Sequence, residues 1–323
     1  MFGTRRTART TLALLGGVTA LALTGCSAGG SAALAEGSLA EDYDLSDVTL
    51  TVGSDSYTEQ LVLGQIALLA LQGAGADAQD ETGLTGTATV RAALESEDID
   101  VYWEYTGTAW VSFLGETTPV VGSDEQYAAV AEADLANGIT WFGATPFNNT
   151  YQLAYSAENN PDLEVETISD VAELINGGDD SLSICVGPEF DVRDDGLPGM
   201  EAAYGFEFPS DNVVVLDDGV IYNEIASSDT CTFGVVFSTD GRIPALDLST
   251  LEDDLAFFPS YNAASITRTD VAEANPDLEA MFTDIASKLT EEEMQALNAQ
   301  VDVDGDSPEQ VAEDWLRAQG YIG

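Results

Sequence analysis

Residues 99–108 read IDVYWEYTGT, a short strand rich in aromatic side chains that ends in a turn of small residues. Before it come an alternating strand over residues 47–52, a loop over 53–56 and an apolar helix over 61–71. A strand–loop–helix–strand order is typical of α/β folds, whose ligands bind in loops at the carboxyl ends of strands. Aromatic faces at such a turn suit a soft organic cation, although they also suit an ordinary strand end.

The same periodicities continue through the rest of the chain. About 280 to 290 residues follow the N-terminal segment, more than one hydrophobic core usually holds, so two domains or lobes are expected. Thr58 and Ser307 are expected to cap helices. The patterns predict helices over residues 88–95, 125–137, 169–176, 277–288, 291–300 and 308–318, and strands over 148–154, 181–186, 213–216, 232–237 and 256–258.

The first 25 residues have the pattern of a signal peptide. Three arginines precede an apolar run at residues 11–23, which is too short to span a membrane comfortably. The run ends in Leu-Thr-Gly-Cys, the pattern of a bacterial lipoprotein cleavage site with Cys26 as the lipidated residue. A plain signal peptide with an incidental cysteine is the alternative. Residues 26–46 would then be a flexible tether that holds an extracytoplasmic protein on the membrane by lipid alone.

The charge is strongly acidic and excludes several classes of partner. Six basic residues stand against 58 acidic ones after Cys26, a net charge of −52. Binding of nucleic acid or anionic lipid through a basic face is therefore excluded. The hydrophobic content of 45% still indicates a globular fold with an acidic surface. Such a surface attracts cationic ligands at low ionic strength.

Histidine is absent from the sequence, which excludes catalytic triads with histidine and histidine-ligated metal sites. We expect no metal and no cofactor. Cys185 and Cys231 are the remaining cysteines, and an oxidising location makes a disulfide between them plausible. It would close a loop of about 45 residues and contribute roughly 3–4 kcal/mol in the chain-entropy model. Two free buried thiols are the alternative.

Six blocks of sequence together resemble one family. They are VGSDSYTEQ (52–60), TGLTGTATVRAALESEDIDVYWEYTGT (82–108), FNNTYQLA (147–154), PEFDVRDDGLPGM (188–200), VVFSTDGRI (235–243) and FFPSYNAA (257–264). In this order they resemble the OpuAC-type substrate-binding proteins of ABC importers for osmoprotectants, which bind glycine betaine, proline betaine, carnitine or choline. The resemblance covers nearly all of the chain after residue 46.

The resemblance implies a fold of two α/β lobes, like that of periplasmic binding proteins, with a discontinuous first lobe. The first lobe would comprise residues 47–148 and 258–323, and the second lobe residues 149–257. The family holds the quaternary ammonium group in a cage of tyrosines from both lobes. Such a cation donates no conventional hydrogen bond, so ring faces and van der Waals contact replace its water.

Residue by residue, the resemblance assigns the aromatic cage. Tyr105, Tyr151 and Tyr261 match cage positions. Phe237 stands where many relatives have tyrosine, and so keeps a ring face without the hydroxyl. Tyr222 lies in a motif near the family's site and is a weaker match. For any lone tyrosine, core packing with a bonded hydroxyl is the competing explanation.

Polar positions of the site follow from the same comparison. Arg193 matches an arginine that contacts the ligand's carboxylate, but it lies among acidic residues and could instead be a structural arginine paired to them. Thr108 and Asn149 match further polar contacts. Asp55 stands where some relatives have lysine. Its presence weakens the expectation of a carboxylate ligand and could favour choline, unless its side chain points to water.

The sequence therefore predicts the lipid-anchored, monomeric receptor of an ABC importer, which binds a quaternary ammonium compound, docks on permease subunits and has no enzymatic activity. Two alternatives come from other classes. An extracytoplasmic hydrolase could use a carboxylate pair drawn from Glu97, Asp98, Asp100 and Glu104, in or just before the segment IDVYWEYTGT. A structural lipoprotein of the cell surface would bind no small ligand.

Overall fold

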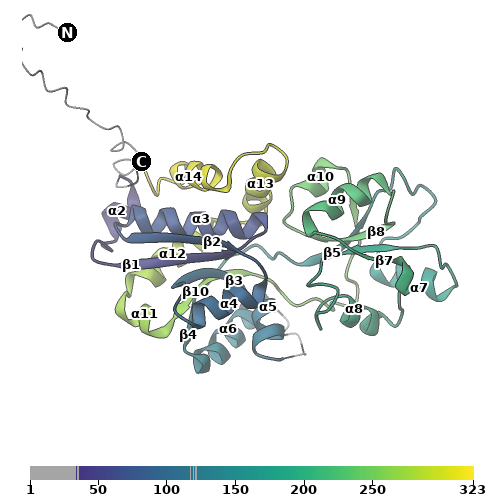
Figure 1. Cartoon of the computed structure of the whole chain (residues 1–323), viewed down its shortest axis with the longest axis horizontal. Coiled ribbons are helices and arrows are strands. Elements are labelled where there is room, and N and C mark those ends of the chain that lie inside the picture. The colour runs from purple at the N-terminus through teal and green to yellow at the C-terminus, as the bar shows by residue number, and fades with distance from the viewer. Residues whose placement is uncertain (1–33, 35, 117, 119, 121) are drawn as a thin grey trace, which may run out of the picture.

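A computed structural model describes residues 34, 36–116, 118, 120 and 122–323, so Cys26 and the expected signal peptide lie outside the described residues. The described chain forms two lobes, each built on a five-stranded sheet (Figure 1). The strand order is β2-β1-β3-β10-β4 in the first lobe and β7-β6-β8-β5-β9 in the second. Strand β10 returns to the first sheet after the chain has built the second. The predicted two-lobed α/β fold with a discontinuous first lobe is thus confirmed.

The first lobe has a mixed sheet covered by helices on both faces. Strand β1 runs parallel to β2 and β3, whereas β10 is antiparallel to its neighbours β3 and β4. Its strands are β1 (Thr49–Asp55), β2 (Asp77–Leu84), β3 (Val101–Tyr105), β4 (Ile139–Ala144) and β10 (Ala263–Arg268). Its helices are α2 (Ser38–Asp42), α3 (Thr58–Gly73), α4 (Thr87–Glu95), α5 (Thr106–Thr108), the π-helical turn η1 (Ala109–Phe113), α6 (Ser123–Asp134), the 3₁₀ turn η2 (Leu135–Asn137), α11 (Thr269–Ala274), α12 (Asp277–Lys288), α13 (Glu291–Asp302) and α14 (Pro308–Ala318).

Helix α3 is the centre of the first lobe. It lies against β1 and β2 on one side and against α13 and α14 on the other (Figure 1). Its apolar residues are therefore buried nearly all round, as its composition predicts. Because α3 is packed on both sides, its position is fixed. Its first turn lies at the end of the first lobe that faces the second lobe.

The second lobe repeats the mixed α/β plan. Strand β6 runs parallel to β7 and β8, and β5 is antiparallel to β8 and β9. Its strands are β5 (Tyr151–Tyr155), β6 (Ile184–Val186), β7 (Val213–Val215), β8 (Phe233–Phe237) and β9 (Ser249–Thr250). Its helices are α7 (Ile168–Asn176), α8 (Leu197–Tyr204), the 3₁₀ turn η3 (Ser210–Asn212), α9 (Asp218–Ser227) and α10 (Arg242–Ala245).

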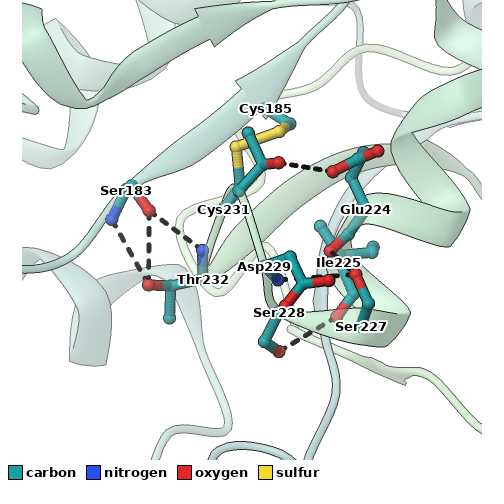
Figure 2. Close-up of a disulfide and its surroundings, with 10 residues drawn as sticks. Ser183, Cys185, Glu224, Ile225, Ser227, Ser228, Asp229, Cys231 and Thr232 are labelled. Atoms are coloured by element: carbon teal, nitrogen blue, oxygen red, sulfur yellow. Dashed lines mark hydrogen bonds between the residues drawn. A yellow bond between two sulfur atoms is a disulfide. The ribbon is translucent and has the colours of Figure 1, made fainter.

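A disulfide joins Cys185 of β6 to Cys231, two residues before β8 (Figure 2). Both cysteines are buried under helix α9, and Ser183 and Thr232 exchange hydrogen bonds beside them. The cross-link fastens two neighbouring strands of the second sheet. Within the described residues, no helix has the length and apolarity needed to cross a membrane.

Several local predictions were wrong for identifiable reasons. Strand β2 was not predicted because this edge strand exposes most of its side chains, so it lacks an apolar alternation. Residues 256–258 form no strand, since Ala256 has a positive φ of 51°. Thr58 is the first residue of α3 rather than its cap, and its hydroxyl donates to Asp302 at 2.6 Å. Ser307 does cap α14, as predicted.

Candidate functional site

A cavity of about 400 Å³ lies between the two lobes. This volume is within the range of roughly 300–1,000 Å³ that is typical of small-molecule sites. The first lobe supplies the end of β1, the first turns of α3 and α4, the end of β3 and the last turns of α13. The second lobe supplies the loop after β6, the start of α9 and the segment after β8. In both lobes the cavity therefore includes loops at the carboxyl ends of strands, where ligands of α/β folds bind.

Aromatic rings from both lobes line this cavity. Tyr57 of the first lobe stacks on Phe237 of the second, with ring centroids 5.9 Å apart and planes 9° from parallel. Tyr105, at the end of β3, and Tyr151, at the start of β5, also line the cavity. Phe190 lines it from the loop after β6, and Tyr102 and Trp103 of β3 line it as well.

Tyr151 is the hub of the aromatic set. Its ring centroid lies 4.8 Å from that of Phe190, 5.5 Å from that of Phe237 and 5.3 Å from that of Tyr261. These spacings are those of favourable tilted and edge-to-face pairs. The pairs hold the Tyr151 ring in place, so one face is presented in a fixed orientation.

Two of the predicted cage residues stand behind the cavity wall. Tyr222 is 1% exposed, and the guanidinium of Arg242 lies 3.9 Å from its ring centroid, so its face is already occupied by a cation. Tyr261 is 2% exposed and donates its hydroxyl to Asp195 at 2.7 Å. Gly107 permits this packing, because a Cβ there would lie 2.7 Å from the Tyr261 ring. Neither tyrosine is among the residues that line the cavity.

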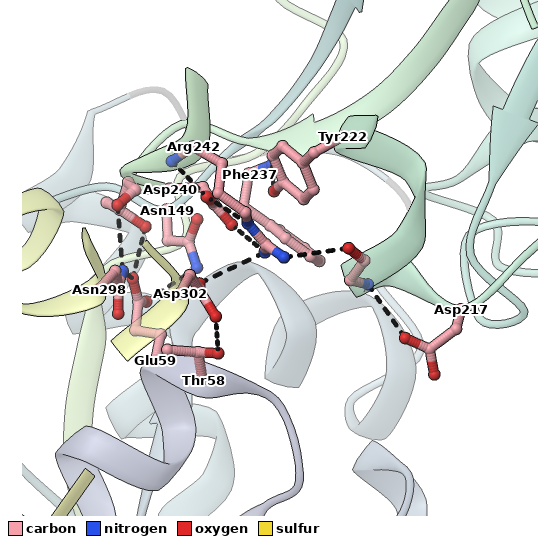
Figure 3. A network of polar contacts seen from close by, with 12 residues as sticks. Thr58, Glu59, Asn149, Asp217, Tyr222, Phe237, Asp240, Arg242, Asn298 and Asp302 are labelled. Atoms are coloured by element: carbon pink, nitrogen blue, oxygen red, sulfur yellow. Dashed lines mark hydrogen bonds and ion pairs between the residues drawn. The ribbon is translucent and has the colours of Figure 1, made fainter. Parts of the chain in front are cut away.

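A buried carboxylate, Glu59, ties the two lobes together at the cavity (Figure 3). Tyr105 donates its hydroxyl to Glu59 at 2.7 Å, and the side-chain amides of Asn149 and Asn298 donate at 2.8 and 2.9 Å. Thr239 of the second lobe donates its hydroxyl to Oε2, the oxygen that also accepts from Asn298. Burial raises the pKa of Glu59, and these four donors oppose that rise. Its place in the first turn of α3 also favours negative charge.

Arg193 is paired with carboxylates through Nε and Nη2. It donates to both oxygens of Asp195 at 2.7 Å, and Glu189 lies 3.6 Å away. Asp195 itself is 3% exposed. Thr108 across the cavity is at the limit of a hydrogen bond, 3.5 Å from Arg193 Nη2. Of the two explanations offered by the sequence, the geometry matches that of an arginine paired to neighbouring acids.

Carboxylates of both lobes face each other at the cavity. Glu189 of the second lobe accepts from the backbone and hydroxyl of Thr87 at 3.0 and 2.8 Å, at the start of α4. Asp55 lines the cavity and accepts a hydrogen bond from the backbone N–H of Gly86. Gly86 has a φ of 92°, a conformation that favours glycine. Burial and the neighbouring carboxylates Asp217, Glu189 and Asp55 raise the pKa of Asp218 to about 6.

Arg242 forms a second bridge between the lobes (Figure 3). Its guanidinium binds Asp240 in the second lobe and lies 3.4 Å from Asp302 at the end of α13 in the first. It also donates to the carbonyl of Gly219 at 3.1 Å. The lobes are therefore joined by Arg242 on one side and by the Thr87–Glu189 contact on another.

The comparison with known proteins accords with this geometry. Residues 48–318 match the OpuAC family, described as the substrate-binding domain of an ABC-type glycine betaine transport system. The chain belongs to this family. The glycine-betaine-binding protein of Pseudomonas aeruginosa is 36% identical over 277 residues, which cover 83% of this chain and 87% of that protein. YehZ of Escherichia coli, a glycine betaine-binding protein, is 30% identical over 276 residues, with 84% and 90% covered.

Solved structures of the OpuAC type share the fold. One described as a glycine betaine/carnitine/choline ABC transporter has a TM-score of 0.68 and 25% identity, and the match covers 84% of this chain and 98% of that one. As a member of the OpuAC family, the chain is the substrate-binding component of an ABC-type transport system. The expectation of a transport binding protein is confirmed, and the structural lipoprotein is set aside.

The carboxylate-pair hydrolase is also set aside, because the four acids in question do not form a pair in this OpuAC chain. Asp100 binds Arg268 at 2.5 Å directly before β3, at the opposite end of this strand from Tyr105, and Glu97 and Asp98 are exposed after α4. Glu104 is 3% exposed and accepts from the Tyr102 hydroxyl and the Tyr105 backbone at 2.7 Å each. These carboxylates therefore have separate partners and no shared site.

Several cavity residues were not identified from the sequence. Tyr57 and Glu59 lie inside the first quoted block, Phe190 in the fourth and Thr239 in the fifth, so the blocks carried a signal for them. Asn298 lies in α13, outside every block, and no local pattern distinguishes it. Only the tertiary packing of α13 beside the second lobe brings it to Glu59.

Glu104 is expected to make stability depend on pH. Burial raises its pKa to about 7, above the usual value of 4.5, so the folded state holds this proton more tightly than the unfolded state. Stability from this group is present below pH ~4.5 and is lost as pH rises to ~7. Between these pH values, wild-type unfolding free energy should fall relative to Glu104→Gln by about 2–3 kcal/mol in urea titrations. Parallel pH profiles of the two proteins would contradict this.

Proposed function

We propose that the chain captures a quaternary ammonium osmoprotectant, of the class of glycine betaine, proline betaine, carnitine or choline, between its lobes and delivers it to a permease. The observation that carries this is the set of aromatic rings from both lobes around one cavity. Ring faces bind a cation that has no hydrogen to donate, and excluding its water strengthens the attraction. Membership of the OpuAC family supports the same ligand class.

The cage would have an inner and an outer layer. Tyr105, Tyr151 and Phe237 would contact the ammonium group, since all three line the cavity. Tyr261 and Tyr222 would act from behind by holding Tyr151 and the segment of Phe237, whose backbone donates to the Tyr222 hydroxyl at 3.1 Å. Asp55, Thr108, Asn149 and Arg193 would surround the other end of the ligand.

Lobe closure would couple binding to transport. In this proposal the lobes comprise residues 47–148 with 258–323 and residues 149–257, and they move about the two connections between them. A closed pair of lobes presents one composite surface to the permease. The mature protein would be a monomer without enzymatic activity, held outside the cytoplasm by lipid on Cys26.

Calorimetric titration with glycine betaine, proline betaine, carnitine and choline tests this proposal. At least one of the four should bind and raise the melting temperature of the protein, because a ligand that binds only the folded state stabilises it. If none of the four binds, the proposed function is wrong.

Replacing Tyr151 by Ala should weaken binding of the best ligand by about tenfold or more, since a desolvated cation–π contact contributes about 1–2 kcal/mol. Tyr151→Phe is the matched control, because it keeps the ring face and should bind within about threefold of wild type. Equal affinities for the Ala and Phe variants, measured by calorimetry, would remove Tyr151 from the cage.

A further inference from the structure

The charges that line the cavity are strongly unbalanced. Eight carboxylates and two arginines line it. Both arginines are already paired: Arg193 with Asp195, and Arg242 with Asp240 and Asp302. The cavity therefore has an excess of negative charge even after its ion pairs are formed. Asp55 of the first lobe and Asp218 of the second belong to this excess, and Glu189, whose nearest arginine atom is 3.6 Å away, adds its charge to both.

The amide and hydroxyl donors around Glu59 are engaged as well. Glu59 accepts from Tyr105, Thr239 and the amide groups of Asn149 and Asn298. Because a carboxylate only accepts, it fixes the orientation of both amides with their nitrogen atoms toward Glu59.

The two amides consequently leave acceptors rather than donors unpaired. Asn149 Oδ1 and Asn298 Oδ1 are buried and have no hydrogen-bond partner among the described residues. Asn149 is 6% exposed and Asn298 3%, and both line the cavity. A buried acceptor without a donor is unfavourable, so a ligand that supplies a donor here gains binding energy.

We propose, on the basis of the proposed function, that the cavity selects a quaternary ammonium ligand that carries no carboxylate and whose other end donates a hydrogen bond, as the hydroxyl of choline does. Asn149 receives the donor, and Asp55 and Asp218 supply the negative field that holds the net cation. This selectivity separates the chain from a receptor for zwitterionic betaines.

A betaine meets two difficulties in this cavity. Its carboxylate is repelled by Asp55, Glu189 and Asp218, and no arginine is free to neutralise it. It also has no hydrogen-bond donor for the Asn149 oxygen. The remaining neutral donors of the lining are the hydroxyls of Tyr57, Thr85, Thr108 and Tyr151 and the indole N–H of Trp103, which has no partner among the described residues. Each of them can bond a hydroxyl as readily as a carboxylate. These donors therefore do not reverse the preference for a ligand without a carboxylate.

The test is calorimetric titration of the purified chain with choline and with glycine betaine at low and moderate salt. Choline should bind at least ~10-fold more tightly than glycine betaine, and the ratio should fall as salt screens the carboxylates. Asp218→Asn should reduce the ratio by about 3- to 10-fold by weakening choline. Asp211→Asn is the matched control, because Asp211 is an exposed acid of the same lobe outside the cavity lining.

A second variant tests whether the pairing of Arg193 with Asp195 disfavours a carboxylate ligand. Asp195→Asn keeps the shape of the side chain but releases the charge of Arg193, so glycine betaine should gain at least ~10-fold relative to choline. Glycine betaine binding as tightly as choline to the wild-type chain would overturn the inference and leave the proposed function standing. Binding of neither ligand nor of any other quaternary ammonium compound would overturn both.

Discussion

Replacing Asp134 by Ala is expected to lower the free energy of unfolding by about 3–5 kcal/mol, because it leaves a buried arginine without its partner. Asp134 is fully buried and Arg91 is 4% exposed. The guanidinium donates to both carboxylate oxygens, at 2.8 and 2.6 Å. Trp141 adds a further bond to Asp134 at 2.9 Å. Water cannot reach the guanidinium to replace these contacts, so the loss should be large.

Glu95 provides the matched control, since it binds the same arginine from the surface. Its carboxylate lies 2.7 Å from Arg91 Nε, but its side chain is 54% exposed. Glu95→Ala should therefore change the free energy of unfolding by about 0–1 kcal/mol. Urea denaturation of both variants measures the difference. Equal effects would mean that the burial of Asp134 does not set its contribution.

The sequence blocks placed several of the residues that line the cavity. Asp55, Tyr105 and Tyr151 lie at the ends or starts of strands, and all three line the cavity. Asp55 and Tyr105 could be placed because the order of strands, loops and helices determines which residues lie at the carboxyl ends of strands. Tyr151, at the start of β5, could be placed only from the resemblance of its motif to the family. The expected cavity follows from the α/β plan of each lobe.

Whether a side chain lines the cavity or packs behind its wall could not be predicted in this way. Tyr222 and Tyr261 occupy motif positions, yet one faces Arg242 and the other bonds Asp195 behind the wall. A motif fixes the position of the backbone, whereas the neighbour of each ring depends on residues from distant segments. Arg193 illustrates the same limit, because the acid that engages it, Asp195, is only one of several nearby in sequence.

Replacing Glu59 by Ala should have the largest effect on the site itself. The change leaves four buried donors without their acceptor, and each unsatisfied donor is unfavourable by about 1–3 kcal/mol before water or repacking compensates. We expect the free energy of unfolding to fall by about 3–4 kcal/mol and choline affinity to fall at least ~10-fold, since Tyr105 loses the contact that orients its ring. Urea denaturation and calorimetry measure the two effects.

Gln65→Ala is the control in the same helix. Gln65 is buried and bonds Asp80 and Thr82 in β2, away from the cavity. It should lose about 1 kcal/mol of stability and keep the affinity for choline.

The Glu59→Gln variant distinguishes two roles of Glu59: joining the two lobes, and setting which ligand the cavity prefers. Its amide keeps one acceptor oxygen but turns a donor toward groups that are themselves donors, so the amide of Asn149 or that of Asn298, whichever faces the new N–H₂ group, must reorient. Reorientation places N–H groups in the cavity, where a carboxylate ligand can accept from them. The ratio of choline to glycine betaine affinity should then fall by about threefold or more, even if the protein remains folded. A stability loss with an unchanged ratio would mean that Glu59 joins the lobes without setting the polarity of the cavity.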